Sequence, residues 1–376
     1  WHQKEPFHAL PERVTADFKK FGRKTGYGEN KKKHTSAWLK KLRQNAALAG
    51  YPNALYPAIT TRACDMRILP TQQPHFSSTE GDSCGWPFDN LQRSSVAANA
   101  PLFVCHISAD KAWALVETDF AFGWIPVQDF AAVDEAFIKK WETGRYAVIT
   151  RDKITVNGAR EEFLLKASLG YIFPLVRNTA EKRELLVAVA DENNKAVIKS
   201  GFINRTEAAA KPLRFNSLNA VKIANELIGE PYGWGGLYGN RDCSALTRDF
   251  FAVFGLWLPR HSQDQVKEVG SYINLAGLNP EEKEKTILTR GIPYLTIIWR
   301  RGHIMLYIGE QEGRALVFHN IWGIRIRDLQ GKQGRKIIGQ AVITTLQPGQ
   351  ELIALDAGGG DLRANISGMS ILAADN

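Results

Sequence analysis

The sequence lacks several features that would assign it to a common class. No run of eighteen apolar residues occurs in its 376 residues, so the sequence predicts no membrane-spanning helix. There is no His-Glu-x-x-His motif and no Cys-x-x-Cys pair, and we therefore expect no metal site and no cofactor. The glycine-rich residues 233–239 lack the Gly-Lys-Ser/Thr ending of a phosphate-binding loop.

Cysteine is also scarce. The chain has only Cys64, Cys84, Cys105 and Cys243. If Cys243 is a catalytic residue, the other three cysteines cannot all form disulfides with one another, which excludes a disulfide framework. We expect no disulfide at Cys243 and at most one bond among the remaining three.

The most informative stretch is residues 231–247, where a loop rich in glycine and aromatic residues leads into Cys243. Apolar side chains follow at a spacing that fits one helix face: Leu246, Phe250, Phe251 and Phe254. Asp242 and Ser244 are residue types that favour a helix start. A thiol in the first helical turn meets unpaired N–H groups and the positive end of the helix dipole, which favours the thiolate and lowers its pKa. The pattern suits a nucleophile, although a lone cysteine is more often a buried structural residue.

A cysteine nucleophile needs a base, and two histidines downstream are candidates. Residues 302–309 and 313–320 have the pattern of two β-strands joined by a hairpin turn. A turn centred on Gln311 places His303 directly opposite His319, with Cβ atoms about 4.5–5.5 Å apart. One imidazole could then contact the thiol while the other fixes its tautomer. A one-residue bulge would break this register, and either histidine alone is as often structural.

Four short motifs follow one another between residues 231 and 307. They are Pro231-Tyr-Gly-Trp-Gly-Gly, Arg241-Asp-Cys-Ser, Leu258-Pro-Arg-His-Ser and Gly302-His-Ile-Met-Leu-Tyr. Together they resemble the NlpC-type cell-wall cysteine peptidases, papain-like hydrolases that cut peptidoglycan stem peptides, over about residues 215–347. The resemblance implies Cys243 as nucleophile, His303 as base and His319 as the third polar member. It also implies that Tyr232 and the backbone N–H of Cys243 stabilise the oxyanion.

Strand-like segments with turn residues between them precede this region. The motif Gly123-Trp-Ile-Pro is echoed by Gly201-Phe-Ile-Asn, a weak internal repeat of the kind expected for tandem barrels. The segments Phe88–Ser94 and 112–126 resemble the first of two bacterial Src-homology-3-like (SH3-like) barrels that some NlpC-type enzymes carry. We therefore expect a helical N-terminal segment (1–60), two SH3-like barrels (61–145 and 146–212) and a papain-like α+β catalytic domain (213–376).

The resemblance further implies cleavage of the bond from γ-D-glutamate to a diamino acid such as diaminopimelate. The predicted substrate-binding residues are Asp242, Ser244, Trp234, Arg260, Ser262, Asp89 and Trp124. In relatives with paired barrels the first barrel closes the far end of the cleft, so we expect a short peptide with a free amino terminus as substrate. Its ammonium group would face Asp242 and Ser244. The alternative is that Asp242 only caps the helix and the barrels bind the wall.

Charge and chain ends bear on the partner and the location. The formal net charge is +9, but the lysines are scattered apart from Lys31–Lys33, a run typical of a solvated loop. An anionic polymer such as a cell wall is as good an electrostatic partner as nucleic acid. We expect peptidoglycan stem peptides as partner, no nucleic acid, and a monomer. The absence of a start methionine and of a signal-like segment at Trp1 fits a mature periplasmic or extracellular chain, with lipid anchoring left open.

Two other functions stay open at this stage. The same thiol and histidines could serve a peptidoglycan amidase or an acyltransferase, since a thioester does not dictate its acceptor. A cell-wall binding module with an inactive catalytic domain is the second alternative, and the presence of Cys243, His303 and His319 argues against it.

Overall fold

The computed structural model of the protein describes residues 1–22, 26–79, 85–327, 333–349 and 360–372. Its chain divides into two compact units. The first comprises Trp1–Leu213, Trp234–Gly239 and Val253–Gly255, and the second comprises Arg214–Gly233, Asn240–Ala252 and Leu256–Asn376. Among the described residues, no helix is both long enough and apolar enough to cross a membrane.

The first unit begins with the helical segment that the sequence predicted. It contains α1 (Pro11–Gly22), α2 (Ser36–Ala46) and the 3-10 turn η1 (Leu48–Gly50). Thr35 ends the preceding loop and caps α2, because its hydroxyl accepts the backbone N–H of Trp38 at 3.1 Å. Apolar residues of both helices pack in one core with side chains of the first sheet. The helix expected around residues 35–49 is therefore α2 followed by η1.

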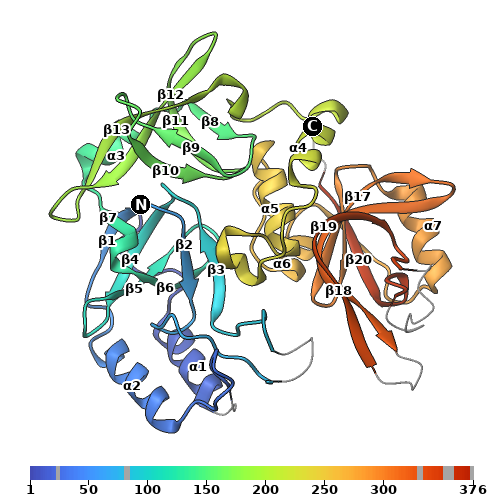
Figure 1. Cartoon of the computed structure of the whole chain (residues 1–376), viewed down its shortest axis with the longest axis horizontal. Coiled ribbons are helices and arrows are strands. Elements are labelled where there is room, and N and C mark those ends of the chain that lie inside the picture. The colour runs from blue at the N-terminus through green and yellow to red at the C-terminus, as the bar shows by residue number, and fades with distance from the viewer. Residues whose placement is uncertain (23–25, 80–84, 328–332, 350–359, 373–376) are drawn as a thin grey trace. The chain divides into compact units, whose positions relative to one another are not determined.

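Two seven-stranded antiparallel sheets follow within this unit (Figure 1). The first sheet contains β1 (Tyr56–Thr60), β2 (Cys64–Arg67), β3 (Gln92–Val96), β4 (Pro101–Ile107), β5 (Trp113–Glu117), β6 (Phe122–Pro126) and β7 (Phe130–Ala132). The second contains β8 (Tyr146–Ile149), β9 (Ile154–Asn157), β10 (Phe163–Ala167), β11 (Ile172–Asn178), β12 (Lys182–Ala190), β13 (Ala196–Asn204) and β14 (Ala208–Ala210). Helix α3 (Glu135–Trp141) lies between them in the chain.

The two sheets have one topology. The first has the order β3-β2-β6-β5-β4-β1-β7, and the second the order β10-β9-β13-β12-β11-β8-β14. Each strand of the second sheet thus corresponds to a strand of the first. A 3-10 turn precedes the last strand in both, η2 (Val127–Asp129) in one and η3 (Arg205–Glu207) in the other. The internal repeat predicted from the two glycine motifs is confirmed, because β6 and β13 are equivalent strands.

The glycines of this repeat have a packing reason. A Cβ added at Gly123 would lie 2.6 Å from Cγ of Met66, and one at Gly201 would lie 2.4 Å from Cγ2 of Val187. Both contacts are too close for a real side chain, so the neighbouring strand can approach only a glycine here. The first sheet already begins at β1, which pairs with β4 and β7 ahead of the boundary placed at residue 61.

The second unit combines helices with one six-stranded sheet. Its helices are α4 (Ser217–Leu227), α5 (Cys243–Val253), α6 (Ser262–Glu268) and α7 (Pro280–Arg290), with the 3-10 turn η5 (Arg363–Asn365). Its strands are β15 (Ser271–Asn274), β16 (Thr296–Arg300), β17 (His303–Gln311), β18 (Arg314–Arg327), β19 (Gln333–Thr345) and β20 (Ile366–Ile371). The sheet order is β15-β20-β16-β17-β18-β19, and the long β18–β19 pair is visible in Figure 1. This is the α+β architecture that the sequence predicted.

Candidate active site

Cys243 is the first residue of α5, as the sequence predicted. Asp242 caps the helix, since its Oδ1 accepts the backbone N–H of Ala245 at 2.9 Å. The sulfur accepts hydrogen bonds from the backbone of Ser244 in its own helix and of Ile304 at the start of β17. The thiol therefore lies between the N-terminus of a helix and the first residues of a strand.

The expected lowering of the Cys243 pKa is wrong for this structure. Burial, and after it the neighbouring Asp242 carboxylate, raise the pKa of the thiol to about 12, although the two backbone hydrogen bonds and Arg260 oppose this shift. The side chain is only 8% exposed, so loss of hydration outweighs the stabilisation at the helix N-terminus. Cys243 is a neutral thiol in the resting site and needs a base to become a thiolate.

The hairpin that carries the two histidines has a different register from the predicted one. Gln311 pairs with Arg314, so the turn consists of Glu312 and Gly313, both with positive φ (51° and 74°). This is the pattern of a two-residue type I′ turn rather than a turn centred on Gln311. A bulge between Tyr307 and Gly309 then shifts the pairing by one residue.

The bulge keeps the two histidines on one face. Beyond it, Leu306 lies opposite Phe318, so His303 and His319 are diagonal neighbours instead of directly opposed. Without the bulge, the two-residue turn would place the histidines on opposite faces, because a shift of one residue turns a side chain over. Nε2 of His303 lies 2.8 Å from Nδ1 of His319. The predicted contact exists, although the bulge that was expected to break it is what makes it possible.

Thr344 on β19 extends this pair into a chain of hydrogen bonds. Its hydroxyl donates to the carbonyl oxygen of Thr345 at 2.7 Å and lies 3.1 Å from Nε2 of His319. Because that hydroxyl proton is used, Nε2 of His319 must be the donor and its Nδ1 the acceptor. Nε2 of His303 then carries the proton shared with His319. The network leaves Nδ1 of His303 as the basic nitrogen of that ring.

Both histidines are neutral at rest. Burial lowers the pKa of His319 to about 3, and burial, His319 and Arg300 together hold the pKa of His303 well below its ordinary value. The thiol beside β17 and the histidine pair are thus both neutral at rest, and any ion pair between them must form during a reaction.

Tyr232 belongs to the loop that precedes Cys243. Its backbone N–H donates to the carbonyl of Gly339 at 2.8 Å, and Nδ2 of Asn320 donates to the carbonyl of Arg241 at 2.9 Å. These contacts tie the loop to β18 and β19. Burial and the nearby Cys243 raise the pKa of the Tyr232 phenol, so it stays protonated and able to donate a hydrogen bond.

The predicted substrate-binding residues beside Cys243 form a buried polar cluster. Arg260 binds Asp242 through two hydrogen bonds, of 2.9 and 2.6 Å, and its Nη1 also contacts Oγ of Ser244. The Ser244 hydroxyl donates to Oδ1 of Asp242 at 3.0 Å. Arg260 thus neutralises the Asp242 carboxylate, a pairing that the sequence did not predict. Ser262, also predicted, is the half-buried first residue of α6.

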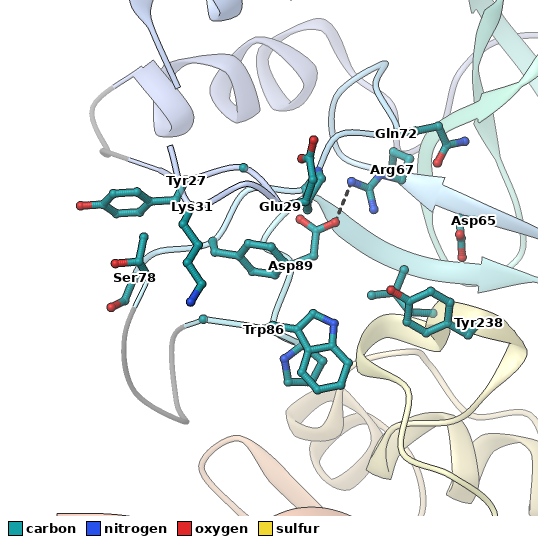
Figure 2. A pocket seen from close by; sticks show the side chains of 17 residues that line it. Tyr27, Glu29, Lys31, Asp65, Arg67, Gln72, Ser78, Trp86, Asp89 and Tyr238 are labelled. Atoms are coloured by element: carbon teal, nitrogen blue, oxygen red, sulfur yellow. Dashed lines mark ion pairs between the residues drawn. The ribbon is translucent and has the colours of Figure 1, made fainter. Parts of the chain in front are cut away.

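The predicted contribution of Trp124 to substrate binding needs correction, whereas that of Asp89 stays a prediction. Trp124 is fully buried in a core of the first unit, where a substrate cannot reach it. The Asp89 carboxylate pairs with Arg67 at 2.7 Å and accepts the backbone N–H groups of His75 and Leu91, so it serves the local fold. Figure 2 shows this ion pair at the wall of a cavity of about 700 Å³ in the first unit.

Trp234 lies in η4 (Trp234–Gly239), which is also part of the first unit. Its indole N–H donates to the carbonyl of Asp89 at 2.9 Å, and its ring packs edge-on against Phe88. In the structure this side chain anchors η4 on the first SH3-like region. Its contact with substrate stays a prediction.

The predictions on disulfides and metal sites concern the cysteines and the other potential ligand side chains of the described residues. Cys64, Cys105 and Cys243 are free, buried thiols, and Cys84 lies outside the described residues. No group of three or more His, Cys, Asp or Glu side chains that could hold a metal ion occurs in the described ranges.

Comparison with known proteins assigns three regions of the chain. Residues 74–126 match an SH3 domain of the SH3b1 type, residues 134–180 an SH3 domain of the SH3b2 type, and residues 229–341 the NlpC/P60 family. No curated protein matches the sequence.

Two solved structures are similar over most of the chain. One is described as a novel NlpC/P60 endopeptidase from Photobacterium damselae subsp. piscicida, with a TM-score of 0.86 and 26% identity over 96% of this chain and 84% of that one. The other is an NlpC/P60 family protein from Bacillus cereus ATCC 10987, with a TM-score of 0.54 and 13% identity over 84% of this chain and 99% of that one, which shows the shared fold. The chain therefore carries an NlpC/P60 domain, the papain-like part of the fold, behind two SH3 domains.

Proposed function

We propose that this protein is a cysteine endopeptidase that hydrolyses the bond from γ-D-glutamate to a diamino acid in peptidoglycan stem peptides. The NlpC/P60 domain supports a cysteine peptidase or hydrolase that acts on peptidoglycan. The observation that carries the proposal is the hydrogen-bonded chain His303–His319–Thr344, which leaves one basic nitrogen on the strand that also contacts the Cys243 sulfur.

The first half of the reaction forms a thioester. Nδ1 of His303 takes the thiol proton of Cys243, and the sulfur attacks the γ-carbonyl carbon of D-glutamate. The backbone N–H groups of Ser244 and Ile304 stabilise the developing thiolate, because they already bond to the sulfur. The tetrahedral intermediate collapses when His303 returns the proton to the leaving amine of the diamino acid.

The second half consumes water. His303 accepts a proton from a water molecule, whose oxygen attacks the thioester carbon, and the γ-carboxylate product leaves as the proton returns to Cys243. In both halves the oxyanion is stabilised by the backbone N–H of Cys243 and the phenol of Tyr232. Removal of one such donor typically costs about 3–4 kcal/mol of transition-state stabilisation. His319 holds His303 in the required tautomer throughout.

We further propose that the substrate is a short peptide with a free amino-terminal L-alanine. Asp242 supports this, because Arg260 and its hydrogen bonds lower its pKa and keep it ionised one residue from the nucleophile. Since Arg260 also offsets its charge, the preference arises from the hydrogen-bonding geometry of Asp242 and Ser244 more than from net charge. We also propose that the protein is a monomer that acts outside the cytoplasm, in the periplasm or the extracellular space.

The test compares two substrates. Free L-Ala-γ-D-Glu-diaminopimelate and its N-acetylated twin are incubated with wild-type protein, and the rates and products are determined by mass spectrometry. We expect the free peptide to be cleaved much faster. Equal rates would refute the requirement for a free amino terminus, and a product joined to an added amine would point to acyl transfer instead of hydrolysis. Ser244→Ala is the cleaner variant for this comparison, because Asp242→Asn also disturbs Arg260.

A further inference from the structure

Three arginines gather beside the proposed base in the sheet of the second unit. Arg300 ends β16 and pairs with His303 across the turn that joins β16 to β17. Arg325 on β18 lies directly opposite Arg335 on β19. None of these residues belongs to the motifs that identified the site.

The strand register puts the three arginines toward the same end of the sheet. Because Leu306 lies opposite Phe318, β17 begins at about the level of Ile321, and β18 continues beyond that point. The extension, with Arg325 and its partner Arg335, therefore runs past the level of the turn that follows Arg300. The proximity has an electrostatic effect: burial and then the charges of Arg325 and Arg335 lower the pKa of Arg300. The charge of Arg335 also acts to lower the pKa of Tyr232, and the charge of Arg300 lowers the pKa of His303.

Without a bound ligand, this arrangement lowers the stability of the folded protein. Like charges directly opposite in an antiparallel pair destabilise a sheet. The Nε atom of Arg300 is buried and has no hydrogen-bond partner in the described part of the chain. Within the same residues, no carboxylate forms an ion pair with Arg300 or Arg325. The buried arginines near Cys243 differ, since Arg241 binds Asp249 at 2.8 Å and Arg260 binds Asp242 at 2.6 Å.

We propose that Arg300, Arg325 and Arg335 form a subsite that binds a carboxylate of the substrate beside His303 and Tyr232. Guanidinium groups suit this ligand, because their N–H groups match the two oxygens of a carboxylate. A bound carboxylate would accept the unused Nε–H of Arg300 and relieve the repulsion between the arginines. The inference rests on the proposed function and adds an anionic recognition element to it.

A stem peptide offers this chemistry from two sources. One is the α-carboxylate of D-glutamate, on the acyl side of the scissile bond, and the other is a carboxylate of diaminopimelate, on the amine side. Replacing D-glutamate by D-isoglutamine removes the first. Replacing diaminopimelate by L-lysine removes the carboxylate at the far end of the diamino acid.

The experiment measures binding in the Cys243→Ala background, so that cleavage does not interfere. Calorimetry gives the affinity of the full chain for L-Ala-γ-D-Glu-diaminopimelate and for the two analogues, with and without Arg300→Gln. Arg325→Gln is a second test variant, because this exposed residue can change with little risk to folding. Arg301→Gln is the matched control, since it removes the same charge from an exposed neighbour.

We expect Arg300→Gln and Arg325→Gln each to weaken tripeptide binding about tenfold or more, the range for a lost charge-assisted hydrogen bond, and Arg301→Gln to change it less than twofold. The analogue that lacks the bound carboxylate should bind weakly to the Cys243→Ala protein, and adding Arg300→Gln should weaken its binding little further. This result identifies which carboxylate of the substrate the arginines bind. Unchanged affinity in both test variants, or equal losses in Arg301→Gln, would overturn the subsite while wild-type cleavage still supports the proposed function. If wild-type protein neither binds nor cleaves stem peptides, the proposed function and the subsite are both wrong.

Discussion

The two sides of Cys243 respond to burial in opposite ways. On the helix side, Asp242 and Arg260 are buried and charged, joined by two hydrogen bonds. On the strand side, the half-buried His303 and the fully buried His319 are neutral, because burial lowers the pKa of each ring. A buried charge persists where an opposite charge lies within hydrogen-bond distance, and otherwise the group loses its charge. The presence of an oppositely charged partner, and not the extent of burial, decides whether each of these side chains is charged.

The two sides of the thiol are therefore expected to have different roles, one in the stability of the fold and one in the reaction. The Asp242–Arg260 pair is fixed and shapes the N-terminus of α5. In the proposed mechanism, the proton on the histidine side moves from Cys243 to Nδ1 of His303 and back. We therefore expect substitutions on the strand side to act on rate, and substitutions on the helix side to act first on stability.

The largest effect on rate should come from the two histidines. His303→Ala removes the general base and should lower kcat about 10²–10⁴-fold. His319→Ala should cost less, because an orienting residue is less essential than the base it orients. Steady-state kinetics on one stem peptide measure both. A loss in His319→Ala that equals or exceeds the loss in His303→Ala would mean that the two roles are assigned wrongly.

On the helix side, Arg260→Met should destabilise the second unit by about 3–5 kcal/mol, since it leaves Asp242 as an uncompensated buried charge. The matched control is the double variant Asp242→Asn/Arg260→Met, which removes both charges and should recover most of that loss. Hydrogen exchange of the α5 amides reports the local stability. If the double variant is as unstable as the single one, packing rather than charge compensation dominates.

A smaller effect is expected at Thr344. Thr344→Val keeps the shape of the side chain but removes the acceptor for Nε2 of His319, so the imidazole pair loses its fixed tautomer. We expect kcat to fall about tenfold, which corresponds to about 1.4 kcal/mol, and Thr344→Ser to retain the wild-type rate. A purely structural role would give the same pH–rate profile in the valine variant. A shifted profile supports the positioning role.

The last effect concerns the pH dependence of stability and leaves the rate aside. The unfolded chain takes up a proton at His319 as the pH falls through the ordinary histidine pKa of 6.5, whereas the folded protein does so only near pH 3. The neutral ring therefore contributes stability above pH 6.5 that is lost on acidification, by about 1.4 kcal/mol per pH unit for one such site. His319→Gln should flatten this dependence in denaturant titrations at pH 7 and 5. A slope unchanged by the substitution would show that other groups cause it.

The sequence predicted those parts of the site that depend on local signals. The apolar spacing after Cys243 and the capping type of Asp242 were enough to predict that α5 starts at the nucleophile. The glycines at 123 and 201 indicated two equivalent domains, because a close approach of two strands requires a glycine at the contact. The two histidines on a hairpin were predicted as well, since alternation and turn residues are local.

The rest depended on contacts between distant residues. The position of Thr344 beside His319 follows from the pairing of β18 with β19, and the one-residue bulge after Tyr307 has no clear sequence signature. Alternation could not tell that Trp124 faces the core. The pKa of Cys243 was predicted in the wrong direction because burial, which the helix-start pattern does not reveal, outweighs the helix N-terminus.

The most direct test of the account is to follow cleavage of free L-Ala-γ-D-Glu-diaminopimelate in ¹⁸O-labelled water by mass spectrometry, with wild-type protein and with Cys243→Ala. The proposed mechanism predicts free diaminopimelate and L-Ala-γ-D-Glu that carries one ¹⁸O in its γ-carboxylate. It also predicts no product from the alanine variant. Cleavage of a different bond, or product formation by Cys243→Ala at the wild-type rate, would contradict it.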